Sequence, residues 1–393
     1  MWPFAALSAS YFAHIGFFNP YLPLWLKDQG LGLLAISLMT SMQSGTRLFA
    51  PFAWGWLSDH TGERVRLLRW CAGVALLVSG GLWLDLGVWG VAAALCLMFT
   101  HTSAMMPMSE AALAHAVSQS GGFDARRYGR IRLWGSLGFL VTVMSAGAWF
   151  ERQGMASFPV WTTATLLAVT ASVWIMPDQR EAPHAVQIKA SLWPVLRQPV
   201  LLWFFGALFL HVLAHVFIYA FFSLYIDALG YGKSVIGLLW AFSVVVEIVF
   251  FYTQSRWLPL LRPAGWLVLA SALMTVRMAV TAGAGHWLWA LFAAQALHAI
   301  TFAAHHSVCI EMLSRHFPAR LRGRGQALYS VLGYGVSGVT GGFVGGLVSS
   351  RWGLEPVFWI GSAVALLATW AAWRLHTLSP AAPGATRFKP AAD

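Results

Sequence analysis

One carboxylic acid, Glu247, stands inside the long apolar stretch AFSVVVEIVFFY at residues 241–252. A lone charge at the centre of a bilayer costs roughly 2.5–3.5 kcal/mol even on a lenient insertion scale. Ionisable residues inside such runs are therefore rare, and they usually serve a function. We predict that Glu247 accepts a proton or pairs with a cationic group of a ligand. The alternative is a fixed structural salt bridge.

A second ionisable residue, Arg47, stands in the apolar stretch TSMQSGTRLFAPFAWGW at residues 40–56, 200 positions before Glu247. Its planar guanidinium matches a carboxylate or a phosphate, so it is a candidate clamp for an anionic group. The alternative is a permanent ion pair with Glu247. Gln43 precedes Arg47 by four residues, which places both on one helix face.

Histidines form a third group of candidates. His211, His215 and Tyr219 share one face of a helix over 200–225, and Gln295, His298, Phe302 and His305 are nearly aligned on another over 286–311. Histidine titrates near neutral pH and can relay protons. The alternative for each is an ordinary hydrogen bond between helices. The predicted substrate- and proton-binding set comprises Arg47, Glu247, Gln43, Asn19, His14, His211, His215, Tyr219, His298 and His305.

The elements that must position these residues are membrane-spanning helices. The chain of 393 residues is 58% hydrophobic and only 10% charged, against about 25% charged residues in soluble globular proteins. A spanning helix needs about 20 mostly apolar residues, whereas a β-barrel would show short alternating segments, which are absent here. Twelve apolar runs fit helices: 4–26, 34–57, 67–87, 89–113, 131–150, 157–176, 200–225, 234–255, 264–283, 286–311, 326–348 and 355–373.

The net charge of +11 follows the membrane topology. With twelve spans and the N-terminus inside, 19 of the 25 Lys and Arg residues fall at cytoplasmic ends and four at outer ends. This bias predicts that both termini are cytoplasmic and argues against a nucleic-acid partner. The other two, Arg47 and Arg277, fall inside spans. We expect Arg277 to extend its side chain to the outer interface.

The sequence repeats itself at a spacing of about 200 residues. LPLWLKDQGLG (22–32) aligns with FSLYIDALGYG (222–232), and LWGSLGF (133–139) aligns with LYSVLGY (328–334). We predict an all-α integral membrane protein with twelve transmembrane helices in two pseudo-symmetric six-helix halves, the plan of a secondary transporter. The expected parts are an N-terminal half (1–177), a cytoplasmic linker (178–199), a C-terminal half (200–376) and a disordered tail (377–393).

Few residues suggest a metal site, a cofactor or enzymatic catalysis. Cys71, Cys96 and Cys309 have no metal-ligand spacing, and neighbouring residues such as His305 and His306 point about 100° apart on a helix. We find no nucleophile–base constellation and no phosphate loop. We therefore expect no cofactor, no metal site and no enzymatic activity. The expected partners are a small-molecule substrate, protons and the lipid bilayer, and the expected state is a monomer.

The loop GWLSDHTGERVR (55–66) resembles the cytoplasmic signature of the major facilitator superfamily, with Gly55, Asp59, Gly62, Arg64 and Arg66 in matching positions. His60 and Glu63 depart from the usual pattern. The resemblance implies that this loop helps to hold an inward gate shut. Glu110 and Glu311 end the spans before two basic loops, and we predict state-dependent gate salt bridges among them and Arg130, Arg132, Arg322 and Arg324. The alternative is fixed bridges within each half.

Four further segments resemble the phenylpropionate permease-like branch of that superfamily, which is related to the lactose permease and nucleoside–proton symporter groups. They are YFAHIGFFNPYLPLWL (11–26), RLFAPFAWGWLSD (47–59), YGRIRLWGSLGF (128–139) and FPARLRGRGQALYSVLGYG (317–335). The resemblance implies proton-coupled symport by alternating access, with an aromatic carboxylate such as phenylpropionate as the candidate substrate.

The expected function is thus proton-coupled import of a small organic solute across a bacterial inner membrane. Nucleosides, sugars or oligosaccharides remain alternative substrates, and efflux of a drug-like compound remains an alternative direction. A membrane acyltransferase-like enzyme and a transporter-like sensor are the rival classes. The repeat and the gate loop argue against the enzyme.

Overall fold

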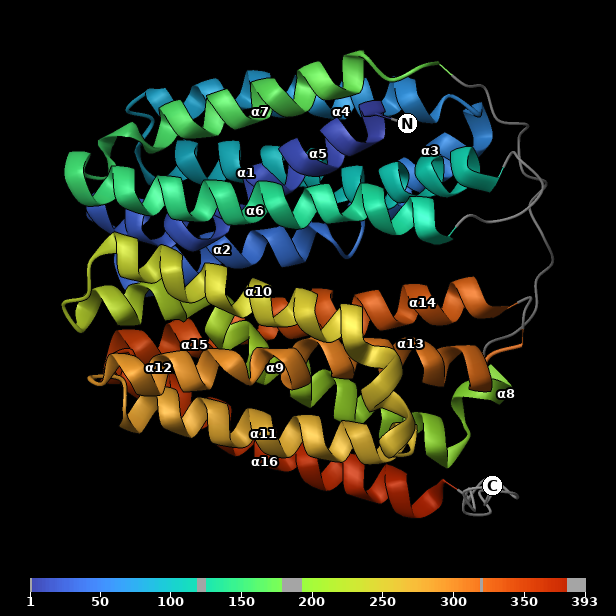
Figure 1. The fold of residues 1–393 in the computed structure, drawn as a ribbon. Helices are drawn as coiled ribbons and strands as arrows, with labels where there is room; N and C mark the ends of the chain where they lie inside the picture. Colours follow the sequence, from blue (N-terminus) through green and yellow to red (C-terminus); the bar gives the residue numbers. More distant parts are fainter. Residues whose placement is uncertain (1, 119–124, 179–192, 319–320, 380–393) are drawn as a thin grey trace, which may run out of the picture.

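The computed structural model describes residues 2–118, 125–178, 193–318 and 321–379, with the side chains of 114–118 and 125–128 left out of the description. Helices cover all twelve predicted runs. Ten helical segments of the described chain are long and apolar enough to cross a membrane, and helix α1 and the pair α2–α3 run alongside them (Figure 1). The prediction of an all-α membrane protein is confirmed.

The described residues of the N-terminal half form seven α-helices, of which two share one run. They are α1 (Trp2–Asp28), α2 (Leu33–Thr46), α3 (Ala50–Thr61), α4 (Arg64–Ser79), α5 (Gly87–Ser118), α6 (Ala125–Gln153) and α7 (Phe158–Trp174), with short 3₁₀ segments η1 (Gly80–Trp83) and η2 (Met155–Ser157).

The short helix α8 (Trp193–Leu196) lies in the predicted linker, before the C-terminal half. The following elements are α9 (Pro199–Ala228), α10 (Lys233–Trp257), η3 (Leu258–Leu260), α11 (Pro263–Gly283), α12 (Leu288–Ala296), α13 (His305–His316), α14 (Arg322–Ser330), α15 (Ser337–Trp352) and α16 (Glu355–Leu378). The predicted linker 178–199 and tail 377–393 lie largely outside the described residues.

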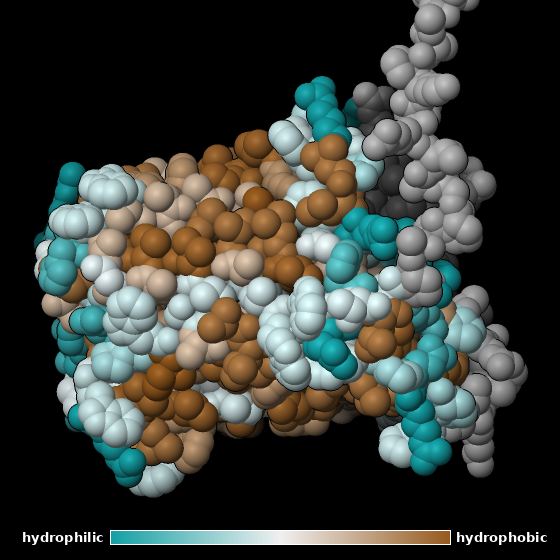
Figure 2. Space-filling model, turned by 90° about the horizontal axis from the view of Figure 1, so that it is seen from below, coloured by the Kyte–Doolittle hydropathy of each residue, from teal (hydrophilic) through white to brown (hydrophobic). Residues whose placement is uncertain are grey.

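The two halves lie side by side, and α1 begins at the same end of the bundle at which α16 ends (Figure 1). We call this the terminal end, and the opposite end the distal end. One face of the molecule carries an apolar band with polar residues gathered at both ends (Figure 2). This distribution suits a protein whose middle faces lipid and whose ends face water.

The second run is not the continuous helix that the sequence predicts. It breaks between α2 and α3, at Arg47–Phe49. Pro51 explains the break, because it lacks an N–H group and its ring would collide with the carbonyl four residues earlier, which belongs to Arg47. The corresponding helix of the other half, α10, contains no proline in its interior and is unbroken around Glu247.

Two other helices change their winding in the middle of the membrane. A π-helical segment, η4 (Ala299–Ala304), separates α12 from α13, and a second, η6 (Val331–Val336), separates α14 from α15. π-helical turns occur frequently at functional sites. Both segments lie next to the polar residues described below.

The halves are joined closely at the distal end. Helix α6 packs along α10 and α2 packs along α15. Methyl groups added to Gly338, Gly342 and Gly346 of α15 would overlap Ser44, Ser41 and Ser37 of α2, respectively. Backbone therefore approaches backbone along this contact, as small residues permit in membrane helices.

The repeated sequence produces a repeated turn. Helices α1 and α9 end at Asp28 and Ala228, exactly the repeat spacing apart, and each is followed by a left-handed glycine, Gly30 (φ +79°) or Gly230 (φ +88°). Glycine adopts this backbone conformation without steric penalty. The two turns lie together at the distal end, since Lys27 and Asp227 form an ion pair with an N–O distance of 2.7 Å between them.

Candidate functional site

A chain of polar contacts links three helices of the C-terminal half. Glu247 of α10 accepts a hydrogen bond from Nε2 of His298, at 3.2 Å from Oε2. On the other side of the ring, Arg277 of α11 donates from Nη1 to Nδ1 of His298, at 3.1 Å. Because a guanidinium only donates, these two contacts fix the neutral tautomer of His298 with its proton on Nε2.

Arg277 is the centre of this network and is only 1% exposed. It also donates to Thr301 Oγ1 (3.0 Å) and to Oε1 of Gln295, and it approaches Nε2 of His215 at 3.4 Å. The expectation that Arg277 extends to the outer interface is therefore wrong. The side chain points inward because several polar acceptors there replace the water that a buried charge needs.

The two predicted histidine stripes meet face to face. The rings of His211 (α9) and His305 (α13) stack with centroids 3.8 Å apart, and those of His215 and His298 lie 5.5 Å apart. His211 donates from Nε2 to the Thr301 carbonyl at 2.7 Å, so its Nδ1 accepts from Ser271 at 3.1 Å. Each of these histidines is thus held in a defined orientation within the C-terminal half.

Tyr219 extends the stacked rings of this network toward α10. It stacks between His215 (centroids 5.0 Å apart) and Trp240 (6.0 Å). Although it lies in the middle of α9, which is mostly buried, Tyr219 is 39% exposed. Tyr219 therefore places a partly exposed ring and hydroxyl beside the histidines of the network.

Arg47 has a different environment from Glu247. It caps the C-terminus of α2, is half-buried, and forms no ion pair or hydrogen bond with any other side chain in the described part of the chain. One turn earlier, Gln43 donates to Oδ1 of Asn19 on α1 at 3.3 Å. Glu247 pairs with His298, so the alternative of a permanent Arg47–Glu247 ion pair does not hold in this structure.

His14 forms no hydrogen bond, ion pair or ring contact with the described side chains of the Glu247–His298–Arg277 network; it lies elsewhere, in the N-terminal half. Its Nδ1 lies 2.9 Å from Oγ1 of Thr165, which places it between α1 and α7, and its ring packs on Phe18 at 4.9 Å. In the described part of the chain, no group of three or more His, Cys, Asp or Glu side chains is arranged to hold a metal ion.

At the terminal end, the predicted gate residues form contacts within each half. Arg132 pairs with Glu110 at 3.2 Å, and Arg315 pairs with Glu311 one turn away on α13. Arg322 lies 3.5 Å from the Ser314 carbonyl, while Arg130 and Arg324 are exposed.

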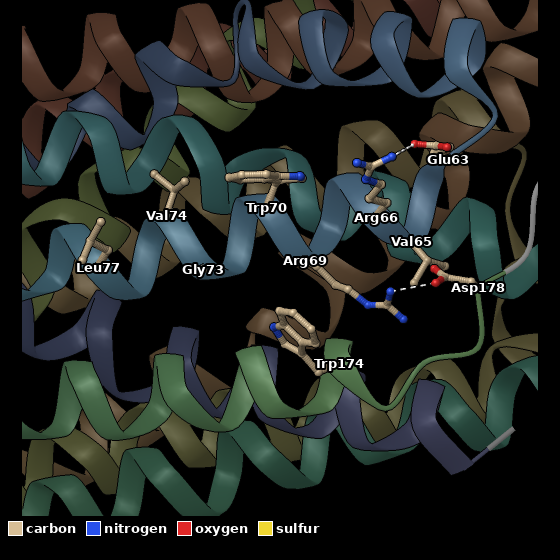
Figure 3. Close-up of a pocket in the computed structure, with 10 residues that line it drawn as sticks. All are labelled: Glu63, Val65, Arg66, Arg69, Trp70, Gly73, Val74, Leu77, Trp174 and Asp178. Atoms are coloured by element: carbon tan, nitrogen blue, oxygen red, sulfur yellow. Dashed lines mark hydrogen bonds and ion pairs between the residues drawn. The ribbon is translucent and has the colours of Figure 1, made fainter.

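The signature loop has the same local character. Asp59 pairs weakly with Arg64 (3.5 Å), and Arg66 pairs with Glu63 (2.8 Å) in the lining of a pocket (Figure 3). Gly62 ends α3 in the left-handed conformation, with φ +67°, and Gly55 lies in the middle of α3 with open space beside it.

Sequence reasoning missed two groups that the structure brings together. Arg277 was assigned to the interface because a single residue carries no sign of its acceptors, which come from three other elements. The Lys27–Asp227 pair could have been predicted, because the aligned segments place these residues at equivalent positions with opposite charges.

Comparisons with known proteins agree with this architecture. The chain is 27% identical over 367 residues to a probable 3-phenylpropionic acid transporter of Escherichia coli (strain K12), covering 91% of this chain and 93% of the relative. It is 26% identical over 352 residues to a maltose permease of Geobacillus stearothermophilus, with coverage of 88% and 87%.

Solved structures share the fold at low sequence identity. The nucleoside transporter NupG superposes with a TM-score of 0.78 at 13% identity, covering 96% of this chain and 99% of that one. The POT family transporter PepTSo superposes with a TM-score of 0.74 at 11% identity, with coverage of 96% and 98%. These two likenesses concern the fold alone.

The family profile covers most of the chain. The profile of the MFS_1-like family matches residues 3–360, which include the signature loop, the broken helix with Arg47 and the whole Glu247–His298–Arg277 network. The chain therefore belongs to the MFS_1-like family, and it is a secondary transporter of the major facilitator type and not an enzyme.

Proposed function

We propose that this transporter imports a small organic carboxylate together with protons, with an aromatic acid such as phenylpropionate as the first substrate to test. The contact chain Glu247–His298–Arg277 is the observation that carries the proposal, because it joins a titratable acid to a buried cation through one imidazole. The similarity to a probable 3-phenylpropionic acid transporter supports the choice of substrate.

Proton binding would weaken this chain. The ionised Glu247 accepts the Nε2 proton of His298, whose Nδ1 is already occupied by Arg277 as donor. A protonated Glu247 can still accept this bond through its carbonyl oxygen, but the bond then loses the strength that the carboxylate charge gave it. Protonation therefore weakens the hold of Glu247 on His298, which couples the proton to a rearrangement of α10 against α11 and η4.

Arg47 would bind the carboxylate of the substrate. A charged group inside a membrane segment needs an anionic or strongly polar partner, and none of the described side chains supplies one. Gln43 lies one turn before Arg47 and bonds to Asn19, and the partly exposed ring of Tyr219 offers an aromatic edge to an aromatic substrate. The substrate would thus lie between the halves, with Arg47 at its acidic end.

Alternating access would use the two ends in turn. The distal end is closed here by contacts between the halves, whereas the ion pairs of Glu110 and Glu311 lie within single halves. We propose that these terminal-end residues exchange partners across the halves in the opposite state. By the positive-inside bias, the terminal end is cytoplasmic, and the two halves, 1–177 and 200–376, move as units of a monomer.

The proposal is tested by uptake of labelled phenylpropionate into proteoliposomes. We expect accumulation that rises with an inward proton gradient and collapses with an uncoupler. Glu247→Gln removes the titratable group and should abolish gradient-driven accumulation while sparing counterflow exchange. Glu355→Gln, at the start of α16 outside the site, is the matched control and should behave like the unaltered protein.

Two results would overturn the assignment. Full concentrative uptake by Glu247→Gln would remove the proton role from this residue. Uptake of maltose or a nucleoside, but not of phenylpropionate, would assign a sugar or nucleoside as substrate, in line with the maltose permease relative.

A further inference from the structure

The π-helical segment η4 lies between two histidines that contact different helices. His298 directly precedes η4 and pairs with Glu247 of α10, and His305 directly follows η4 and stacks on His211 of α9. Successive residues of an α-helix are turned by about 100° around its axis. A π-helical turn holds about one residue more, because its hydrogen bonds join residues five apart instead of four. The winding of η4 therefore sets the directions of His298 and His305 relative to each other.

The sequence of η4 does not account for its winding. Its six residues, AITFAA, include neither proline nor glycine, whereas the second π-helical segment, η6, contains two glycines in VLGYGV. A regular helix can also be distorted where a side chain from elsewhere inserts into its ladder of hydrogen bonds. The cause of the winding of η4 is therefore to be sought in its contacts with other helices.

One backbone carbonyl of η4 is passed over by the helix and is bound by a side chain. The N–H of His305 bonds to the carbonyls of Ile300 and Phe302, and not to that of Thr301, which would be its acceptor in an α-helix. His211 donates from Nε2 to the Thr301 carbonyl at 2.7 Å. Thr301 is fully buried, so its carbonyl needs a donor from the protein. His211 thus takes the place of one helical hydrogen bond.

His211 is itself held firmly. Its Nδ1 accepts a hydrogen bond from Oγ of Ser271 on α11 at 3.1 Å, and its side chain is only 1% exposed. Both ring nitrogens are thus used within the protein, and neither is left for a substrate or a coupling proton. Arg277 binds Thr301 as well, but through the side-chain oxygen Oγ1, so the contact with the backbone carbonyl belongs to His211.

We propose that His211 is a positioning residue, whose hydrogen bond to the Thr301 carbonyl holds η4 in the π-helical winding and thereby turns His298 toward Glu247. This role rests on the proton coupling proposed above for Glu247. Without the bond, the Thr301 carbonyl accepts from the N–H of His305, η4 takes the α-helical winding, and His298 turns away from Glu247. His211 therefore acts through His298 and not on the substrate.

The test compares two substitutions at His211 in the intact protein, reconstituted in proteoliposomes. His211→Phe keeps a ring that can stack on His305 but removes the donor, whereas His211→Gln keeps an N–H donor near the position of Nε2. We expect His211→Phe to retain counterflow of phenylpropionate but to lose most of its gradient-driven accumulation, as Glu247→Gln should. His211→Gln should recover most of the accumulation. Full accumulation by His211→Phe would overturn the proposal.

Tyr225→Phe is the matched control. Tyr225 also lies on α9 and donates to a backbone carbonyl, that of Ala282 at 3.0 Å, but this carbonyl belongs to the regular α-helix α11. The control should accumulate substrate like the unaltered protein. Ser271→Ala is a milder variant that removes only the support of His211, and it should cause a smaller loss of accumulation than His211→Phe. Unaltered accumulation by Ser271→Ala would contradict the proposal even if His211→Phe failed to fold.

A double substitution separates positioning from general stability. His298→Ala should lose accumulation, and adding His211→Phe to it should cause no further loss, because the effects of residues that act through one contact do not add. Additive losses would assign His211 a purely structural role.

The winding can be observed directly by cryo-electron microscopy of His211→Phe bound to an antibody fragment. We expect the N–H of His305 to bond to the Thr301 carbonyl and His298 to point away from Glu247. An unchanged η4 would overturn the proposal. This readout needs no transport, so a failure of the proposed proton coupling, which would appear in the unaltered protein as well, is distinct from a failure of this inference.

Discussion

Arg47 and Glu247 occupy equivalent positions in the two repeats, yet their surroundings differ. Arg47 stands at a helix break that Pro51 imposes, and it has no partner among the described side chains. Glu247 stands in a continuous helix and is tied to His298 and Arg277. One half thus presents an unused charge, and the other holds its charge in a network. The charge of the first repeat is thus suited to an exchangeable ligand, and the charge of the second repeat is suited to a proton bound inside the protein.

The largest effect should follow from removing the buried cation. Arg277→Met leaves the acceptors of Gln295, Thr301 and His298 without their donor in a buried site. Each such loss costs about 1–3 kcal/mol, so we expect a clear fall in the thermal unfolding temperature in detergent and loss of transport. An Arg277→Met protein with unaltered stability and uptake would show that the network is dispensable.

The same substitution at Arg47, in the other half, should act differently. Arg47→Met orphans no described partner, so stability should change little, whereas the affinity for the carboxylate should fall at least tenfold, which corresponds to about 1.4 kcal/mol. The measurement is counterflow of phenylpropionate beside its neutral amide. Equal losses for both compounds would argue against a carboxylate contact.

A smaller effect should follow from removing the proline at the break between α2 and α3. Pro51→Ala restores the N–H that can bond to the Arg47 carbonyl, so amide exchange over 47–55 should slow and transport should fall as Arg47 is drawn into a regular turn. Pro159→Ala is the control, because Pro159 lies in the first turn of α7, where proline is well tolerated. Unchanged exchange over 47–55 would assign the break to packing and not to Pro51.

The smallest effect concerns the distal ion pair. Lys27 is half exposed, and exposed pairs contribute about 0–1 kcal/mol. Lys27→Asp should shift the balance between states slightly toward distal opening, and the double exchange with Asp227→Lys should restore it. Distances between spin labels across the distal end would report this. A double variant that stays shifted would mean that Lys233, which lies 3.5 Å from Asp227, dominates.

The sequence was sufficient to predict the helices and their division into two halves. The apolar length of each run predicts a helix, and the segments that align at a spacing of about 200 residues predict the repeat. The sequence also placed His211, His215, His298 and His305 on faces that do meet. It failed at Arg277, whose acceptors come from α9, α12 and η4, and at Arg47, where a helix was expected through Pro51. Such contacts depend on how separate helices pack, which periodicity within one helix does not record.

The glycine contact between α15 and α2 can be used to favour one conformation of the transport cycle. Because Gly338, Gly342 and Gly346 meet serines with no room for a methyl group, a valine at Gly342 penalises only those conformations in which the two helices touch. The variant should accumulate in the conformation that is open at the distal end. Purified in that form, it would serve as an immunogen for conformation-selective antibody fragments, giving access to a state that the unaltered chain does not adopt here.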